Sequence, residues 1–455
     1  MIVSFSKGAG KVSSLIRCGF VLTLVSGAMN PVNSQADVSN HSSRMIFQKD
    51  TITENTESFT PLNTLITEAL ENNPEIRAAE DEREAAQQRI APAEALDDPQ
   101  VEVGVLYMPI AASPFRSEDM TMKMIGLSQN LPFPGKRGLR KDVASKDAEA
   151  IDQGYRETIN RVIRDLKLAY FDLGLTLERT KLVKKNKSIL EGFLHLAEYH
   201  YKVGLGSQVD ALKAQTQVSR MQDELLILAR ERPVIEAELI RTLGRNTNGA
   251  TLIPASLHIH EELLNLASLR ETALAQRPQL LALQSLVARS DKVLDLAHKD
   301  YYPDFTPRLM YGQRESRQDG IGRADEVSFT VTINLPVWRK NKLEPRVAEA
   351  LSLRNQAINQ HQVQRNEITA NLRQQAATTE QSLMSARLYQ TNILPQARLT
   401  VESAMAAYQV NRVDFLTLLD SQMTVFNYEI NLVTALANYN KALAEIDFLV
   451  GKKHN

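Results

Sequence analysis

The sequence predicts a mainly α-helical protein made of two similar halves, each with a β-hairpin set between helices. Three observations predict this fold class: an internal repeat, very long stretches of helix-forming residues, and two pairs of segments in which apolar and polar residues alternate. A repeat of this length fixes the architecture, because each copy is expected to form the same supersecondary unit. The predicted unit, present twice, is a helix, a β-hairpin and a long helical hairpin.

The internal repeat relates positions 204 residues apart. Residues 130–136 (Asn-Leu-Pro-Phe-Pro-Gly-Lys) reappear at 334–340 as Asn-Leu-Pro-Val-Trp-Arg-Lys. A three-residue insertion later moves the offset to 207. Further matched pairs are Asn73 with Arg277, Pro99 with Pro303, Tyr201 with Tyr408, Gly204 with Asn411, Gln215 with Gln422 and Gly244 with Gly451. A correspondence held over about 180 residues with one small slip indicates a duplication.

The N-terminus is typical of an exported protein. Basic residues precede the apolar stretch 18–29, and small residues follow it, as a signal peptidase requires. We expect residues 1–36 to be a signal peptide cleaved after Ala36, with cleavage after Ala28 as the alternative. The apolar stretch is about 12 residues long, whereas a membrane-spanning helix needs roughly 20. The single cysteine, Cys18, would leave with this peptide, so thiol chemistry is not expected in the mature chain.

The composition excludes some partners. The formal net charge is −1, and no basic tract indicates a nucleic-acid partner. Residues 37–60 are rich in Ser, Thr and Asn and predict an extended N-terminal lead-in. Nothing after residue 40 resembles a transmembrane helix, so a membrane crossing by the mature chain would need strands.

Each repeat is expected to begin with two shorter helices. The first repeat covers 61–250, a linker covers 251–265, and the second repeat covers 266–455. A helix is predicted to start with Thr60 as its cap and Pro61 at its first helical position, and Asn73-Pro74 breaks it.

Long helices follow each predicted hairpin. The expected spans are 137–203 and 208–243 in the first repeat and 343–410 and about 413–450 in the second, with kinks at Pro233 and Pro395. Their apolar stripes are narrow, as in the seams of coiled coils. The predicted seam residues are Leu212, Val218, Met221, Leu225, Leu418, Phe426, Ile430 and Val433.

The two predicted hairpins lie at about 99–131 and 303–336. In the first, Val101, Val103 and Val105 alternate with polar residues or glycine, and the same period of two continues through the second hairpin. Strands of about 9–12 residues can cross a bilayer when tilted in a barrel, and they also suit a hairpin in a soluble sheet. The alternation leaves both interpretations open.

Four motifs carry a family resemblance. They are the Ala-Leu…Asn-Pro-Glu-Ile run at 69–76, Leu-Pro-Phe-Pro-Gly-Lys at 131–136, Tyr-x-Val-Gly-Leu-Gly-Ser at 201–207, and the stretch from Tyr408 to Gln422. With the duplicated order of elements, the chain from about residue 61 resembles the TolC-like family of outer-membrane efflux factors. The 131–136 run is most similar to members that serve heavy-metal efflux.

The resemblance implies a fold and a function. It implies a homotrimer in which each chain gives four strands to a 12-stranded transmembrane β-barrel and long helices to a periplasmic α-barrel. The trimer would lie in the outer membrane of a Gram-negative bacterium and extend into the periplasm. It would be a passive exit duct that a periplasmic adaptor (membrane fusion) protein joins to an inner-membrane pump, expected to be of the resistance-nodulation-division type. Heavy-metal cations are the expected cargo; drug efflux, type I secretion and a soluble periplasmic coiled-coil scaffold are the alternatives.

The resemblance also implies a gate at the periplasmic end of the duct. Asp420 matches one of two acidic positions that line this constriction in the family, and Thr417 stands at the other. Asp210, the repeat equivalent of Thr417, could restore the carboxylate. Crowded carboxylates in a three-fold assembly would attract cations, whereas solvated aspartates on a helix face would do nothing specific.

Two further sets of residues match functional regions of the family. The adaptor-docking tips are the turns of the helical hairpins, and turn geometry alone also explains their glycines. The tip residues are Val203, Gly204, Leu205, Gly206 and Ser207 in the first repeat and Asn411, Arg412 and Val413 in the second. The junction between barrel and helices is expected at Pro132, Pro134, Gly135, Pro336 and Trp338. Beside it, Lys136 could meet lipid headgroups or only flank the barrel.

No constellation of residues indicates an enzyme. The eight histidines form no metal-protease motif, and the chain has no nucleophile elbow, phosphate loop or cysteine cluster. We therefore expect no catalytic residues, no cofactor and no metal-ligand set.

Overall fold

A computed structural model describes residues 60–108, 110, 114–245, 254, 257–259 and 264–452. All of them belong to one compact unit, Glu57–Asn455. The predicted signal peptide, almost all of the lead-in and most of the 251–265 linker lie outside the described residues.

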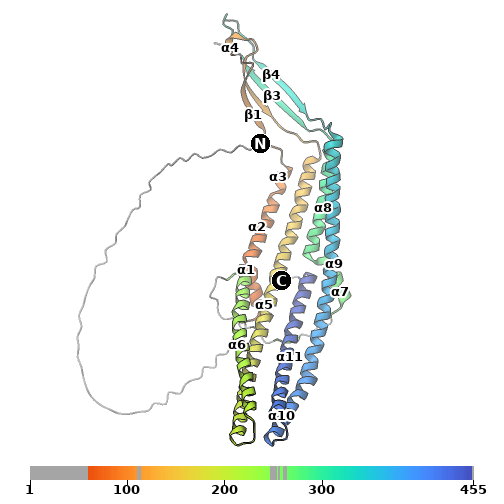
Figure 1. The fold of residues 1–455 in the computed structure, drawn as a ribbon. Coiled ribbons are helices and arrows are strands. Elements are labelled where there is room, and N and C mark those ends of the chain that lie inside the picture. Colours follow the sequence, from red (N-terminus) through yellow and green to blue (C-terminus); the bar gives the residue numbers. More distant parts are fainter. Residues whose placement is uncertain are drawn as a thin grey trace, which may run out of the picture. The chain divides into compact units, whose positions relative to one another are not determined.

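The order of elements repeats along the chain (Figure 1). The first half contains α1 (Leu62–Asn72), α2 (Pro74–Gln88), α3 (Ile90–Glu94), β1 (Gln100–Leu106), α4 (Pro114–Ser117), β2 (Met122–Ser128), α5 (Lys136–Lys202) and α6 (Gln208–Leu243). The second contains α7 (Leu266–Gln276), α8 (Pro278–Lys299), β3 (Phe305–Gln313), β4 (Glu326–Ile333), η1 (Arg339–Leu343), α9 (Glu344–Leu388), η2 (Tyr389–Ile393), α10 (Leu394–Gln409) and α11 (Phe415–Val450).

The duplication is visible in how equivalent residues pack. Gly244 and Gly451 end α6 and α11 with φ of 70° and 71°, in the left-handed region that glycine tolerates best. A Cβ on Gly244 would lie 2.4 Å from the carbonyl oxygen of Asn72, and one on Gly451 would lie 3.1 Å from Cα of Arg277. In both halves the glycine therefore packs where the first short helix gives way to the second.

One local expectation needs correction. Helix α1 begins at Leu62, and Pro61, in extended conformation, is its N-cap, so Thr60 caps nothing. The hydroxyl of Tyr170 on α5 donates to the carbonyl of Thr60 at 3.1 Å, which helps hold the incoming chain against α5. The long second-half helix contains two π-helical turns; η2 ends two residues before Pro395, and the chain is helical on both sides of the proline. Helix α6 likewise continues through Pro233.

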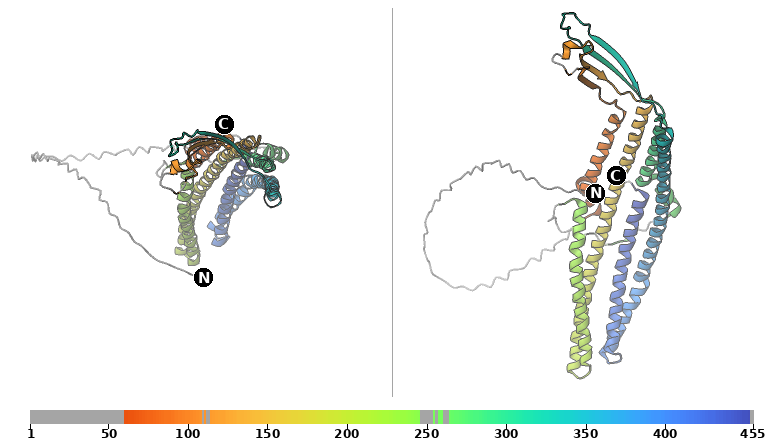
Figure 2. Two further views of the ribbon diagram at one scale, coloured as in Figure 1. Left: turned by 90° about the horizontal axis from the view of Figure 1, so that it is seen from above. Right: turned by 45° about the horizontal axis from the view of Figure 1, so that its top comes forward.

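The helices form a single layer, as the two views of Figure 2 illustrate. Near the sheet, α2 packs on α5, α5 on α8, and α8 on α9. At the other end, α6 packs on α5, α5 on α11, and α11 on α9 and α10. Among the described residues, no helix combines the length and the apolar character needed to span a bilayer.

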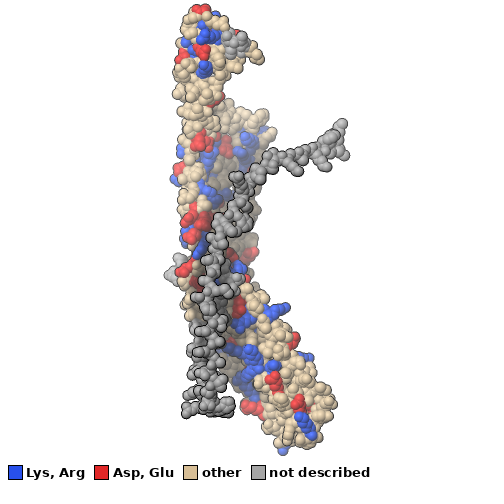
Figure 3. All heavy atoms as spheres, turned by 90° about the vertical axis from the view of Figure 1, so that its left-hand side faces the viewer, with Lys and Arg blue, Asp and Glu red and all other residues tan. Residues whose placement is uncertain are grey.

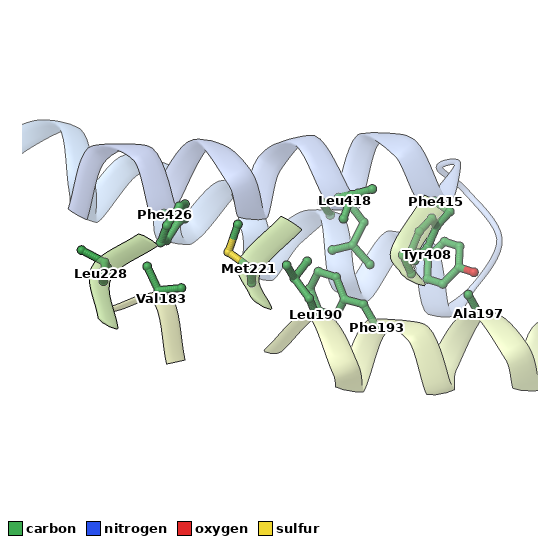
Figure 4. Close-up of a cluster of buried hydrophobic side chains, with 13 residues drawn as sticks. Val183, Leu190, Phe193, Ala197, Met221, Leu228, Tyr408, Phe415, Leu418 and Phe426 are labelled. Carbon is green, nitrogen blue, oxygen red and sulfur yellow. The ribbon is translucent and has the colours of Figure 1, made fainter. Parts of the chain in front are cut away.

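The largest apolar cluster joins the two helical hairpins (Figure 4). Leu190 and Phe193 of α5 meet Tyr408 of α10 and Phe415 and Leu418 of α11. The predicted seam residues Met221, Val218, Leu225, Phe426 and Ile430 belong to this cluster. Leu212 does not: it is 54% exposed, because Ala211 and Ala214 occupy the packed face of α6 at this turn.

Candidate functional site

The four strands form one antiparallel sheet in the order β1-β2-β3-β4, so β1 and β4 each have one unpaired edge. Residues in register therefore share a face across all four strands. One such row runs from Val103 through Ile125 and Tyr311 to Val327, and these side chains are 76%, 52%, 43% and 68% exposed. An exposed row of apolar side chains across four strands is unfavourable in water and suits lipid.

We call this side the apolar face. Its apolar residues include Val101, Val103, Val105, Ile125, Leu127, Leu309, Tyr311, Val327, Phe329, Val331 and Ile333, and two polar residues, Lys123 and Gln313, lie on the same side where β2 begins and β3 ends. All of them are exposed in the single chain.

The opposite side, the polar face, has a different composition. Its residues include Glu102, Ser128, Arg308, Glu326, Ser328 and Thr330, together with Met122, Met124 and Met310. Glu102 forms an ion pair with Arg308 across the sheet, and Glu326 pairs with Arg314. A sheet with one apolar and one polar face suits the wall of a barrel that separates lipid from water, and its two free edges must be paired before it can lie in lipid.

The junction between the sheet and the helices is fixed by buried charge. Gly135, with φ of 94°, is the N-cap of α5 and turns the chain into that helix. Asp304 accepts a hydrogen bond from the backbone N–H of Phe133 at 2.7 Å and an ion pair from the ammonium of Lys136 at 2.9 Å. Lys136 is only 3% exposed, so its ammonium serves this internal pair and cannot meet lipid headgroups.

The other predicted junction residues differ in exposure. Pro132 and Pro336 are half-buried, Pro134 is exposed, and Trp338 is 70% exposed just before η1. At the same junction, next to the end of α8, the rings of Phe133 and Tyr302 stack with centroids 4.6 Å apart.

The three gate candidates lie at the far ends of α6 and α11. Asp210 and Ser207 form a capping box: the Ser207 N–H donates to the Asp210 carboxylate at 3.3 Å, and the Val209 N–H donates to the Ser207 hydroxyl. In the second half, Asp414 caps α11, and both the N–H and the hydroxyl of Thr417 donate to it. The hydrogen bond from the Thr417 hydroxyl holds the pKa of Asp414 below its ordinary range.

Positions 210 and 417 are therefore both committed to capping their helices. This role had not been expected from the sequence, which suggested only a carboxylate at the constriction. Asp420, one turn further along α11, is exposed, as Thr417 is.

The two hairpin tips have the same backbone design. Gly204 has φ of 76° and its repeat equivalent Asn411 has φ of 56°, and asparagine is one of the few residues besides glycine that tolerate this region. The apolar tip residues Val203, Leu205 and Val410 are 48%, 59% and 62% exposed. Val413, predicted as a tip residue, instead packs partly against the large apolar cluster.

Two features of the helical hairpins were not predicted from the sequence. The ring of His200 stacks on that of Tyr408, with centroids 4.9 Å apart, and so joins α5 to α10. Burial raises the pKa of Tyr408, and the charge of Asp210 raises it further. Glu429 of α11, 7% exposed, accepts ion pairs from Lys185 of α5 at 3.0 Å and Arg398 of α10 at 2.7 Å. In the sequence, Glu429 could have been recognised as a carboxylate that lies between the predicted seam residues Phe426 and Ile430.

Figure 3 shows Lys and Arg interspersed with Asp and Glu along one side of the unit. Within the part of the chain that the structure describes, no group of three or more His, Cys, Asp or Glu side chains could hold a metal ion.

Known proteins resemble this chain in sequence and in fold. The family profile described as "Outer membrane efflux protein" matches residues 65–245 and 269–452. The cobalt-zinc-cadmium resistance protein CzcC of Cupriavidus metallidurans is 23% identical over 336 residues, which is 71% of this chain and 76% of that protein. The multidrug resistance outer membrane protein MdtQ of Escherichia coli O157:H7 is 26% identical over 161 residues, 35% of this chain and 33% of that protein.

The fold agrees with solved structures. The outer membrane protein VceC of Vibrio cholerae superposes with a TM-score of 0.72 at 16% identity, over 86% of this chain and 96% of that chain. The mainly α-helical, duplicated fold predicted from the sequence is thereby confirmed as that of TolC-like outer-membrane channels.

Proposed function

The chain belongs to the outer membrane efflux protein family, and we propose that it is the exit duct through which a three-component export system releases heavy-metal cations. The β-sheet is the observation that supports a duct. Its apolar face is suited to lipid, its polar face to an aqueous lumen, and its two edges to pairing with further strands. Four strands are too few to close a pore.

A homotrimer solves the problem of the free edges. If β4 of one copy pairs with β1 of the next, three copies close a 12-stranded barrel that has no edge left. The single layer of helices supports the same assembly, because among the described residues it ends with α2 and α6 on one side, and on the other with α10 and with α9, which has only the short α7 beside it.

The cargo is proposed from a relative. CzcC, whose name states cobalt, zinc and cadmium resistance, matches most of the chain, and the 131–136 run supports the same branch. The shorter match to MdtQ favours a second candidate, export of organic drugs through the same duct. In either case the proposed duct performs no catalysis and needs no cofactor.

The proposed partners are a periplasmic adaptor and an inner-membrane pump of the resistance-nodulation-division type. The two tips would receive the adaptor, since each presents exposed apolar side chains on a rigid turn at the end of the helices. Cysteines introduced at Ser207 and Arg412 should crosslink to the adaptor in intact cells. A lack of crosslinks at both positions, with export unaffected, would contradict docking at the tips.

The duct itself is tested with purified full-length protein. We expect it in the outer-membrane fraction, with residues 1–36 removed, as a trimer that runs differently on gels with and without heating. In planar bilayers it should pass ions. A soluble periplasmic monomer without conductance would instead support the coiled-coil scaffold.

Deletion of the gene tests the cargo. If the cargo is metal, cells should become sensitive to cobalt, zinc or cadmium salts and keep their resistance to organic drugs. The opposite pattern of sensitivity would support the drug-export candidate.

A further inference from the structure

Three methionines gather on the polar face of the sheet, where most neighbours are charged, hydroxylated or glycine. We call Met122, Met124 and Met310 the methionine cluster. Met122 and Met124 lie two residues apart on β2 and so share a face, and Met310 of β3 lies opposite Gly126, two residues further along that same face. Met122 is 7% exposed, and the other two are half-buried.

The positions of the sulfurs can be read from the glycines between them. A Cβ built on Gly312 would lie 2.4 Å from Sδ of Met122, and one on Gly126 would lie 3.7 Å from Sδ of Met310. Gly312 is directly opposite Met124, and Gly126 follows it on the same face. The sulfurs of Met122 and Met310 thus cover the two glycines that flank Met124.

Packing alone is a poor explanation for this arrangement. Glycine inside a strand weakens it and commonly marks a place where another group must approach closely. Here Gly104, Gly126 and Gly312 all border methionines, so the sheet gives up stability to make room for thioether side chains. Their long, flexible side chains can adjust to converge on one point.

Thioether sulfur is a soft, uncharged ligand. Among the metal ions of cells it selects Cu(I), and Ag(I) shares this preference, whereas divalent ions such as zinc favour imidazole, carboxylate or thiolate. The carboxylates near the cluster are engaged, Glu102 with Arg308 and Glu326 with Arg314. The local chemistry therefore disfavours a site for divalent ions such as zinc.

We propose that Met122, Met124 and Met310 form a thioether site for soft monovalent cations, Cu(I) or Ag(I), on the luminal side of the barrel. The luminal position of the site rests on the proposed function, whereas the choice of the three methionines as ligands does not. Neutral ligands suit a transit site, because passage requires binding strong enough to admit the ion and weak enough to release it.

Binding of Ag(I), supplied as silver nitrate in chloride-free buffer, tests the site on detergent-solubilised full-length protein. We expect one ion per chain by calorimetry. Met310→Leu, which keeps the volume of the side chain, should weaken binding by roughly tenfold or more. The matched control is Met384→Leu on α9, since Met384 is 59% exposed and distant in sequence from the sheet; it should bind like the wild type. Equal Ag(I) affinity in the Met310→Leu and wild-type proteins would overturn the proposal.

A second measurement needs no variant. Ag(I) should slow the oxidation of Met122, Met124 and Met310 by peroxide, followed by mass spectrometry, and leave the oxidation of Met384 unchanged. Equal rates with and without Ag(I) at all three residues would likewise overturn the site.

Neither measurement involves transport, so their results do not depend on whether the protein forms a duct. A protein that conducts ions but ignores Ag(I) would retain the proposed function and lose the thioether site. A protein that binds Ag(I) but does not conduct would lose the function.

Discussion

At the scale of single residues, Gly244 shows how closely the two ends of the first repeat are joined. It ends α6 with φ of 70°, and its missing side chain leaves room for the carbonyl of Asn72. The neighbouring Asn73 caps α2 through its side-chain oxygen and donates from its amide to the carbonyl of Thr242 at 2.7 Å. A single backbone position therefore sets both the end of α6 and the break between α1 and α2.

We predict that Gly244→Ala is strongly destabilising. The left-handed conformation costs a non-glycine residue about 1–2 kcal/mol, and the clash with the Asn72 backbone adds to it. Thermal or denaturant unfolding of the purified protein measures the loss.

Gly192→Ala is the matched control. Gly192 lies inside α5, and a Cβ there meets nothing within 4 Å. This change should stabilise by up to about 1 kcal/mol, because alanine is the better helix former. If both substitutions had the same effect, the close contact at Gly244 would not matter.

At the scale of elements, the two hairpins are built alike and joined by different chemistry. Ser207 and Asp414, which are repeat equivalents, cap α6 and α11. The link between hairpins is made by the buried rings of His200 and Tyr408 and by Glu429, which holds cations from two other helices. Local turn and cap signals in the sequence could predict the first property but not the second.

The gate remains a prediction at this scale. We expect Asp420→Asn to reduce the inhibition of conductance by divalent cations, because three copies of this carboxylate would face one another at the constriction. Asp210→Asn should mainly weaken the start of α6, by about 0.3–1 kcal/mol, because the amide oxygen can still accept from Ser207 but the negative charge in the first helical turn is lost. Single-channel recordings separate the two effects.

Asp223→Asn serves as the control, because Asp223 is an exposed carboxylate on α6 outside the caps. If cation block were the same in the Asp420→Asn, Asp223→Asn and wild-type channels, the acidic gate would be wrong.

At the scale of the whole molecule, the sheet decides where this outer-membrane efflux channel meets lipid. Neighbouring residues of β4 point to opposite sides, so Val331 belongs to the apolar face and Thr330 to the polar face. The pairing of strands from both repeats, β2 with β3, makes each face continuous across the duplication.

Lysine substitutions at these two positions should therefore differ sharply. Val331→Lys would place a charge in the bilayer, at a cost of about 2–4 kcal/mol near its midplane, and should reduce the yield of heat-modifiable trimer. Thr330→Lys would place the same charge in the aqueous lumen, where it should be tolerated. Similar yields for the two variants would show that the assignment of the faces is wrong.

The sequence by itself determined the duplication, the helix spans and the strand faces. Expected helix 208–243 coincides with α6, and expected helix 137–203 differs from α5 by one residue at each end. Periodicity, glycine caps and prolines are local signals, so the chain states them directly.

Only the tertiary structure decided how particular side chains are used. Lys136 became half of a buried ion pair, and Met122 came to lie over Gly312. The ion pair and the methionine contact join residues that are far apart in the chain, and whether a capping residue faces a lumen depends on how the helices pack. Such pairings follow from packing between the two halves, which no local pattern of residues encodes.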